Sequence, residues 1–162
     1  EKGNICSAVF LDLSEAFDAV DYGILMSKLS SVGVSPRSLE WFSSYLSNRS
    51  QQTSCDNKLS EALPVTFGVP QGRFLGPLLF LVYKLSTATA AIQHSEVSSY
   101  ADDAVLYRFA KEPRELESKL NADLYNVALW LNANRLTLNL SKTKSILIGS
   151  NKKLINIFSF YF

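Results

Sequence analysis

Ser99-Tyr100-Ala101-Asp102-Asp103-Ala104-Val105-Leu106-Tyr107 places two adjacent carboxylates between apolar, β-prone residues. Residues 96–100 and 104–107 are predicted to form two strands joined by a tight Ala-Asp-Asp turn, because β-branched and aromatic residues bound the polar pair. Neighbouring side chains of a strand point to opposite faces, so both acids reach one site only if the turn redirects them. The stretch predicts a hairpin with acids at its tip, and by itself it is also compatible with a solvated turn.

A third carboxylate lies upstream, in residues 7–13, which are predicted to form a buried strand. Val9, Leu11 and Leu13 would lie on one face of this strand and Asp12 on the other. Carboxylates that meet on one sheet surface repel each other, at a cost of roughly 4 kcal/mol for a pair ~4 Å apart at an effective dielectric constant of about 20. The acids must therefore take up protons or bind cations.

The type of ligand indicates the metal and the chemistry. Carboxylate oxygens without Cys or His nearby favour Mg²⁺ or Mn²⁺ over zinc. Two such ions a few ångströms apart bind both the attacking and the leaving oxygen in phosphoryl transfer. The residues therefore predict nucleotidyl or phosphoryl transfer.

Composition sets the class of protein. The chain has 162 residues, 47% of them hydrophobic, which suffices for one core but not for two domains of ordinary size. Its net charge of +1 favours no partner, but residues 124–162 contain five basic residues and no acid, which suits a polyanion. Two cysteines without metal-binding spacing, and the absence of a signal peptide, predict an intracellular protein. Because no apolar run is long enough to span a bilayer, we expect that the protein does not enter a membrane.

Four helices are predicted, beginning after Asp21, at Pro36, at Pro77 and at Pro113. The third is so apolar that we expect it to be covered on nearly every side, and Trp41 and Trp130 are expected in the core. Residues 49–67 are predicted to form a hairpin and residues 143–148 a strand. Helices and hairpins without strict alternation indicate an α+β fold, in which an antiparallel sheet has helices packed on one face.

Four motifs follow one another in the chain: Phe10-Leu11-Asp12-Leu13-Ser14-Glu15-Ala16-Phe17-Asp18-Ala19-Val20-Asp21, Gly68-Val69-Pro70-Gln71-Gly72, Tyr100-Ala101-Asp102-Asp103 and Asn139-Leu140-Ser141-Lys142-Thr143-Lys144. Together they resemble a reverse transcriptase of the non-LTR (LINE-type) retrotransposon family. The resemblance implies a polymerase palm over residues 1–149, without fingers and thumb, and a non-matching apolar tail over residues 150–162. It also implies transfer of nucleotides from dNTP to the 3′ end of a DNA primer on an RNA template, with two Mg²⁺ or Mn²⁺ ions.

The resemblance assigns the catalytic residues of the palm. It implies that Asp12 and Asp102 hold both metal ions, that Asp103 is an auxiliary acid and that the backbone carbonyl of Leu13 is a further ligand. Lys142 resembles the residue that protonates the leaving pyrophosphate, a role that needs a mobile cation near developing charge. A solvated lysine in a turn is the alternative.

The same resemblance assigns the substrate-binding residues. Phe17 lies where the family places an aromatic ring that excludes a 2′-hydroxyl, although a core phenylalanine is the alternative. Gln71 and the backbone of Gly72 resemble the loop that touches the incoming base and the template, where glycine permits close approach. A plain loop is the alternative there. Asp18 and Asp21 are interpreted as turn and helix-capping residues without a catalytic role.

Three features depart from the family: Arg73 replaces a small hydroxyl residue, residues 84–90 replace a polar turn, and residues 154–162 form an apolar run. They leave open the alternative of a decayed, catalytically inactive fragment with at most weak nucleic-acid binding. Another two-metal enzyme, such as a nucleotidyl cyclase, is disfavoured by residues 68–72, because a cyclase has no template.

Overall fold

The computed structural model describes residues 3–72, 74–85, 91–100 and 103–149. Arg73, Ala101, Asp102 and residues 150–162 lie outside the described residues. The chain divides into two compact units, the first made of residues 1–16 and 87–162 and the second of residues 17–86. The first unit is therefore built from two separate stretches of sequence and the second from one.

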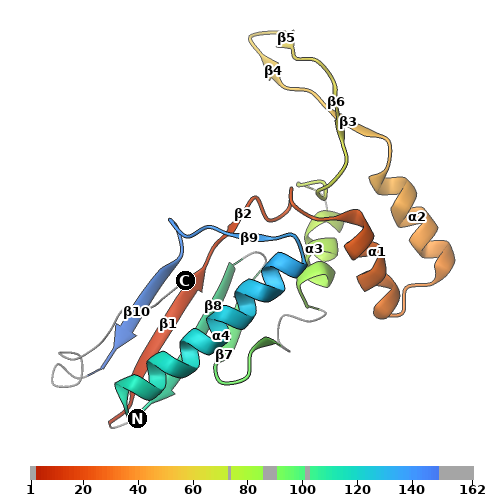
Figure 1. Cartoon of the computed structure of the whole chain (residues 1–162). Coiled ribbons are helices and arrows are strands. Elements are labelled where there is room, and N and C mark those ends of the chain that lie inside the picture. The colour runs from red at the N-terminus through yellow and green to blue at the C-terminus, as the bar shows by residue number, and fades with distance from the viewer. Residues whose placement is uncertain (1–2, 73, 86–90, 101–102, 150–162) are drawn as a thin grey trace. The chain divides into compact units, whose positions relative to one another are not determined.

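A four-stranded antiparallel sheet in the order β10-β1-β8-β7 forms the first unit (Figure 1). Its strands are β1 (Ile5–Leu11), β7 (Glu96–Tyr100), β8 (Asp103–Ala110) and β10 (Lys144–Ile148). Central strand β1 pairs with both β8 and β10, and the β1–β8 register runs from Ile5 opposite Ala110 to Leu11 opposite Ala104. The predicted hairpin is confirmed, because β7 pairs with β8 up to Tyr100 opposite Asp103.

Helix α4 (Pro113–Ala133) packs against one face of this sheet (Figure 1). Apolar residues of the helix recur every three or four positions and fall on one side of it: Leu116, Leu120, Leu124, Val127 and Leu131. Leu120 and Leu124 pack against Val9, Leu11 and Leu106 of the sheet. Burying a leucine side chain fully contributes about 1.5–3 kcal/mol, so this stripe holds helix and sheet together. The predicted α+β class is confirmed.

The predicted strand ends two residues earlier than expected. β1 stops at Leu11, and Leu13 belongs to β2 (Leu13–Ser14), which pairs with β9 (Thr137–Leu138) in a separate two-stranded sheet. The Asp12 N–H donates to Thr143 Oγ1, 3.3 Å away, so the backbone leaves the sheet at Asp12. The expectation that Leu13 shares the buried face of Val9 and Leu11 is therefore wrong, and Leu13 is half-buried.

Three helices pack within the second unit: α1 (Tyr22–Ser31), α2 (Pro36–Leu46) and α3 (Leu75–Leu85). The first two begin as predicted, because Asp21 Oδ1 accepts from the Ile24 N–H at 2.9 Å and Ser35 Oγ accepts from the Ser38 N–H at 3.3 Å. Such caps satisfy backbone donors that the helix leaves unpaired. Among the helices of the described residues, none is long and apolar enough to cross a membrane.

Two burial predictions for these helices are wrong. Leu78 and Leu81 of α3 are exposed, while Leu79, Phe80 and Tyr83 are buried, so α3 is not covered on nearly every side. Trp41 of α2 is 54% exposed and stacks on Tyr45 with ring centroids 5.4 Å apart. An aromatic ring on an amphipathic helix need not reach the core when a neighbouring ring shields one of its faces.

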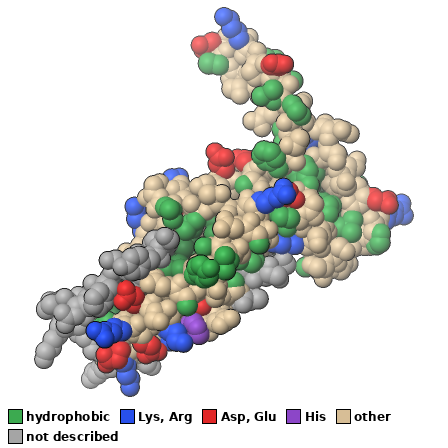
Figure 2. Space-filling view, viewed as in Figure 1, with side chains coloured by type: hydrophobic (Ala, Val, Ile, Leu, Met, Phe, Trp, Pro, Cys, Tyr) green, Lys and Arg blue, Asp and Glu red, His purple; other side chains and the backbone are tan. Residues whose placement is uncertain are grey.

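Residues 49–65 form a ribbon of two nested strand pairs, which confirms the predicted hairpin. β3 (Arg49–Gln51) pairs with β6 (Leu63–Val65), and β4 (Ser54–Cys55) pairs with β5 (Lys58–Leu59). Asp56 and Asn57 at the tip both have positive φ, the conformation of a tight hairpin turn. Residues 51–64 are all exposed, and acidic and basic side chains gather near the tip (Figure 2).

Candidate active site

Asp12 stands at the end of β1, where its backbone is held by the turn that leads into β10. Its carbonyl accepts from the Asn139 N–H at 2.8 Å, and its N–H donates to the hydroxyl of Thr143, a buried residue 131 positions away. The main chain of the half-buried Asp12 is therefore held through both its N–H group and its carbonyl.

Asp103 is the first residue of β8, at the same end of the sheet. The β1–β8 register ends with Leu11 opposite Ala104, so Asp12 follows β1 at the end of the sheet where β8 begins with Asp103. Strand alternation puts Asp103 of β8 on the face opposite α4, together with Phe10 of β1, which is 42% exposed. Carboxylates that lie near each other repel, and a bound cation would relieve that repulsion.

The donor atoms fit a hard divalent cation as far as the structure describes them. Asp12 and Asp103 supply only carboxylate oxygens, the ligands that Mg²⁺ and Mn²⁺ prefer. In the described part of the chain no group of three or more His, Cys, Asp or Glu side chains gathers to bind a metal. Asp102, the third predicted acid, lies outside the described residues, between Tyr100 and Asp103.

Lys142 lies in the turn that holds Asp12. The Lys142 N–H donates to the carbonyl of Asn139 at 3.2 Å, and Asn139 is the residue that donates to Asp12. Lys142 is exposed, and its side chain is free to reach toward the acidic end of the sheet because it extends from a solvated turn. Leu13 is paired with Leu138. Four predicted site residues thus belong to the first unit.

Phe17, Gln71 and Gly72 belong to the second unit, where residues 17–22 and 68–72 are joined by hydrogen bonds. The Val69 N–H donates to the Phe17 carbonyl and the Gly68 N–H donates to the Val20 carbonyl, both at 2.8 Å. The half-buried ring of Phe17 packs on Phe80 with centroids 4.7 Å apart. These bonds hold the aromatic ring and the loop together within one unit.

Gly68 is the residue that permits this close approach. Its φ is +85°, and a Cβ atom added there would lie 2.8 Å from the carbonyl oxygen of Asp18. The Gly68 carbonyl accepts from the Tyr22 hydroxyl at 3.0 Å and from the Arg49 guanidinium at 3.4 Å. Burial raises the pKa of Tyr22, while the neighbouring Arg49 lowers it. Gly68 therefore fixes the start of the loop that carries Gln71.

Sequence reasoning missed Asp18 as a partner of that loop. Gln71 Nε2 donates to both carboxylate oxygens of Asp18, each 3.1 Å away. Asp18 was interpreted as a turn residue, and its position just after Phe17 was the only signal available. Asp21, in contrast, is the helix cap that the sequence predicts.

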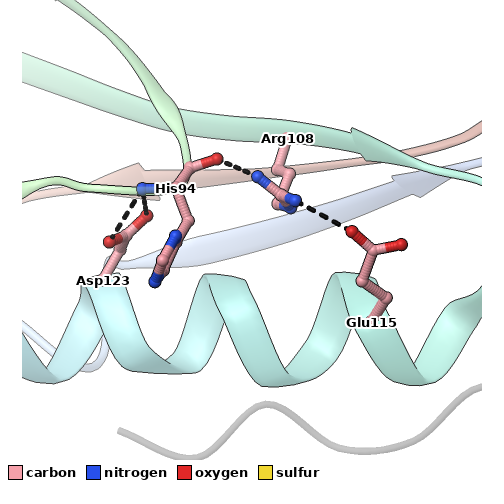
Figure 3. A network of polar contacts seen from close by, with 4 residues as sticks. All are labelled: His94, Arg108, Glu115 and Asp123. Carbon is pink, nitrogen blue, oxygen red and sulfur yellow. Dashed lines mark hydrogen bonds and ion pairs between the residues drawn. The ribbon is translucent and has the colours of Figure 1, made fainter.

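Sequence reasoning also missed a buried acid on α4. Asp123 is fully buried, and its carboxylate accepts from the backbone N–H groups of Gln93, at 2.9 Å, and His94, at 3.0 Å to the nearer oxygen (Figure 3). Arg108 donates to the His94 carbonyl and pairs with Glu115 at 3.1 Å. The segment before β7 is thus held through its N–H and its C=O groups, and β7 leads to the acidic turn.

The chain is similar to several known proteins. The family model described as "Reverse transcriptase (RNA-dependent DNA polymerase)" matches residues 1–157. The probable RNA-directed DNA polymerase from transposon BS of Drosophila melanogaster is 31% identical over 85% of this chain and 16% of its own length. The RNA-directed DNA polymerase from mobile element jockey of the same species is 29% identical over 90% of this chain.

A solved structure shares the fold. Telomerase from Candida albicans, solved with a fragment of telomeric RNA, aligns with a TM-score of 0.62 at 14% identity, over 96% of this chain and 29% of its own length. At this identity the likeness concerns the fold alone. The chain spans about 16% of the length of the curated relatives named above.

Proposed function

Because this chain belongs to the reverse transcriptase (RNA-dependent DNA polymerase) family, we propose that it forms the palm of an RNA-directed DNA polymerase of a non-LTR retrotransposon. The reaction is nucleotidyl transfer from a dNTP to the 3′ end of a DNA primer on an RNA template. The observation that supports this proposal is the pairing of β1 with β8 up to Leu11 opposite Ala104, after which Asp12 and Asp103 stand at the same end of the sheet. No observation favours the alternative of a decayed, inactive fragment.

Reverse transcriptases generally use divalent metal ions. Asp12, Asp102 and Asp103 would hold two Mg²⁺ or Mn²⁺ ions here, with the Leu13 carbonyl as a further ligand. Such ions supply positive charge to the attacking and leaving oxygens of the transfer. The protein's part is to present these carboxylates on a rigid sheet edge.

The other predicted residues orient the substrates. Phe17 excludes a ribose 2′-hydroxyl by its bulk, and its packing on Phe80 keeps the ring in place. Gln71 and the Gly72 backbone contact the incoming base and the template. Lys142 gives a proton to the leaving pyrophosphate from its exposed turn, where a long cationic side chain has room to move. The family description and the relatives described as RNA-directed DNA polymerases support an RNA template.

A chimaera tests the activity, because the chain covers only a sixth or so of the relatives' length. Residues 5–149 replace the matching segment of the jockey polymerase, and Mg²⁺-dependent primer extension on RNA is measured. We expect extension, and Asp102→Asn should lower it at least about a hundredfold, since metal ions supply several kcal/mol of charge stabilisation. Exposed Asp56→Asn, on the ribbon tip, is the control and should have no effect. Extension that survives Asp102→Asn would contradict the metal assignment.

The chain by itself should bind Mn²⁺ weakly, and it should not extend a primer. Line broadening by Mn²⁺ at Asp12 and Asp103 measures the binding, and Asp12→Asn should abolish it. The same substitution removes repulsion between the acids, so the metal-free protein should melt no lower than the unsubstituted chain. Broadening that persists in Asp12→Asn would place the metal elsewhere.

A further inference from the structure

The segments 17–22 and 68–72 are joined by two main-chain hydrogen bonds, by the Tyr22 hydroxyl on the Gly68 carbonyl, and by one contact between two side chains. Phe17 and Val20 accept through their carbonyls, whereas Gln71 and Asp18 meet through their side chains. Main-chain bonds fix where the loop lies. A bond between two side chains determines which atoms the loop presents.

The chemistry of Asp18 determines the orientation of the Gln71 amide. An ionised carboxylate can only accept hydrogen bonds, so the amide nitrogen, and not its oxygen, must face Asp18. Nε2 lies 3.1 Å from each of the two carboxylate oxygens. Oε1 forms no hydrogen bond with any residue that the structure describes. Gln71 therefore presents an acceptor.

The hydrogen bonds between Asp18 and Gln71 contribute little to the free energy of folding, so their effect is on the orientation of the Gln71 side chain. Asp18 and Gln71 are both exposed, and water competes for an exposed hydrogen bond. The two side chains line a hollow of about 290 Å³ in the second unit, together with Arg49, Gln51 and Phe67. The main chain of Asp18 is held beside the loop, because Phe17 and Val20 on either side of it accept hydrogen bonds from the N–H groups of Val69 and Gly68.

We propose that Asp18 is a positioning residue that fixes the Gln71 amide, so that the loop meets a bound nucleotide with a hydrogen-bond acceptor. The proposal rests on the proposed function, in which this loop contacts the nucleotide. The matching group on the nucleotide is a donor, either a sugar hydroxyl or a base amino group. Asp18 itself touches no substrate.

The orientation is tested in the ¹⁵N-labelled 162-residue chain. Asp18→Ala should shift the side-chain amide signals of Gln71 toward their positions in an unstructured peptide. The backbone amides of Gly68 and Val69 should keep their protection from exchange, because their acceptors are main-chain carbonyls. Glu61→Ala, which removes an exposed acid from the same unit, is the matched control. Gln71 signals that do not change in Asp18→Ala would overturn the proposal.

The consequence for recognition is tested by titrating the same chain with dATP and Mg²⁺. Asp18→Ala and Gln71→Ala should each weaken binding about fivefold, and together no more than either alone. Gln71→Glu alone should bind worst, because two carboxylates then face each other. Adding Asp18→Asn to Gln71→Glu keeps the charge of the pair and restores an outward acceptor, so binding should return to within about twofold of the original.

Two analogues identify the donor. If the donor is the sugar hydroxyl, Asp18→Ala should not change the affinity for 2′,3′-dideoxy-ATP, which lacks that hydroxyl. If the donor is on the base, Asp18→Ala should not change the affinity for the purine deoxynucleotide that lacks the amino group. Sensitivity that persists with both analogues, or a swapped pair that fails to rescue binding, would overturn the proposal. If no variant binds dATP, the proposed function fails in its nucleotide part, and the Gln71 signals alone decide whether Asp18 fixes the amide.

Discussion

The two units position their site residues by different means. In the first unit, strand register brings together residues about a hundred positions apart in the sequence, and a buried acid fixes the segment that leads into the hairpin. In the second, a turn and a loop meet through short main-chain hydrogen bonds that a glycine makes possible. Long-range sheet pairing sets the carboxylates, whereas local backbone fit sets the substrate loop. Substitutions should therefore damage one unit and spare the other.

The largest effect on folding is expected from Asp123→Ala. It removes the fully buried carboxylate that accepts from the N–H groups of Gln93 and His94, which costs about 3 kcal/mol and lowers the melting temperature by roughly 10 °C. Hydrogen exchange should become faster at Gln93 and His94 but not at Gly68 or Val69.

Glu115→Ala is the matched control for that substitution. It removes an ion pair whose glutamate is half exposed, and such pairs contribute at most about 1 kcal/mol. A loss from Glu115→Ala as large as that from Asp123→Ala would show that the ion pair, and not the buried acid, holds the segment before β7.

Gly68→Ala should affect the second unit by about 2 kcal/mol. The added methyl group would press on the Asp18 carbonyl, and the positive φ is strained for any other residue. Gly33 also has a positive φ, +90°, but a Cβ atom added there would meet no atom within 4 Å. Gly33→Ala should therefore lower the free energy of unfolding by only about 1 kcal/mol. The difference in melting temperature between Gly68→Ala and Gly33→Ala therefore measures the effect of the close contact between residue 68 and the Asp18 carbonyl. Equal losses in the two variants would mean that the approach imposes no constraint.

Phe17→Val addresses specificity in the chimaera that tests the activity. Removing the ring should raise the use of ribonucleotides relative to deoxyribonucleotides about tenfold or more, because steric exclusion of the 2′-hydroxyl is lost. The ratio of kcat/KM for the two substrates is the measurement. Phe42→Val, on α2, is the control. A ratio that stays constant while activity is preserved would make Phe17 a core residue.

The smallest effect concerns pH and Lys28, whose ammonium group donates to the Tyr83 carbonyl and lies 4.6 Å from the centre of the Tyr83 ring. Burial lowers the pKa of Lys28 from 10.5 to about 8. Between these values the unfolded chain holds more protons, so the free energy of unfolding should rise with pH, by at most about 1.4 kcal/mol per pH unit.

Two tyrosines limit the pH range in which that slope can be measured. The pKa values of Tyr22 and Tyr107 are raised, by burial and by a hydrogen bond to Glu96 respectively, so these residues oppose the trend as the pH passes 10. Burial also raises the pKa of the Cys6 thiol from its ordinary value of 9.0, so Cys6 opposes the trend near that pH. Urea unfolding between pH 8 and about 9.5 in a Cys6→Ser background therefore isolates Lys28, and Lys28→Met should remove the rise. A slope that persists in Lys28→Met would assign the effect to another group.

The sequence predicts best those elements whose signals are local. The leucine stripe of α4, the caps Asp21 and Ser35 and the acidic hairpin each follow from a few neighbouring residues. The break after β1 could not be predicted, because it depends on Thr143, which lies far along the chain. Trp41 was misplaced because periodicity indicates a face of a helix but not what covers that face.

The site divides in the same way. Motifs indicated Asp12, Asp103 and Gln71 by their position in a known order, but no spacing rule links Gln71 to Asp18. Asp123 lies within an apolar stripe, where a charged residue suggests a solvated edge of the helix, and only the fold shows which N–H groups it binds. Polar contacts between segments that are distant in the sequence could not be predicted from the sequence.

The two-part composition of the first unit has a consequence for synthesis on the ribosome. Residues 17–86 emerge as one stretch and can fold before the rest appears, whereas β1 must wait for β8 and β10. At roughly 5–20 residues per second, β1 stays unpaired for about 5–20 s before β8 has emerged. A strand with apolar residues on alternate positions is open to wrong partners during that time. Nascent chains of this protein should therefore bind chaperones at β1, and they should complete the acidic end of the sheet last.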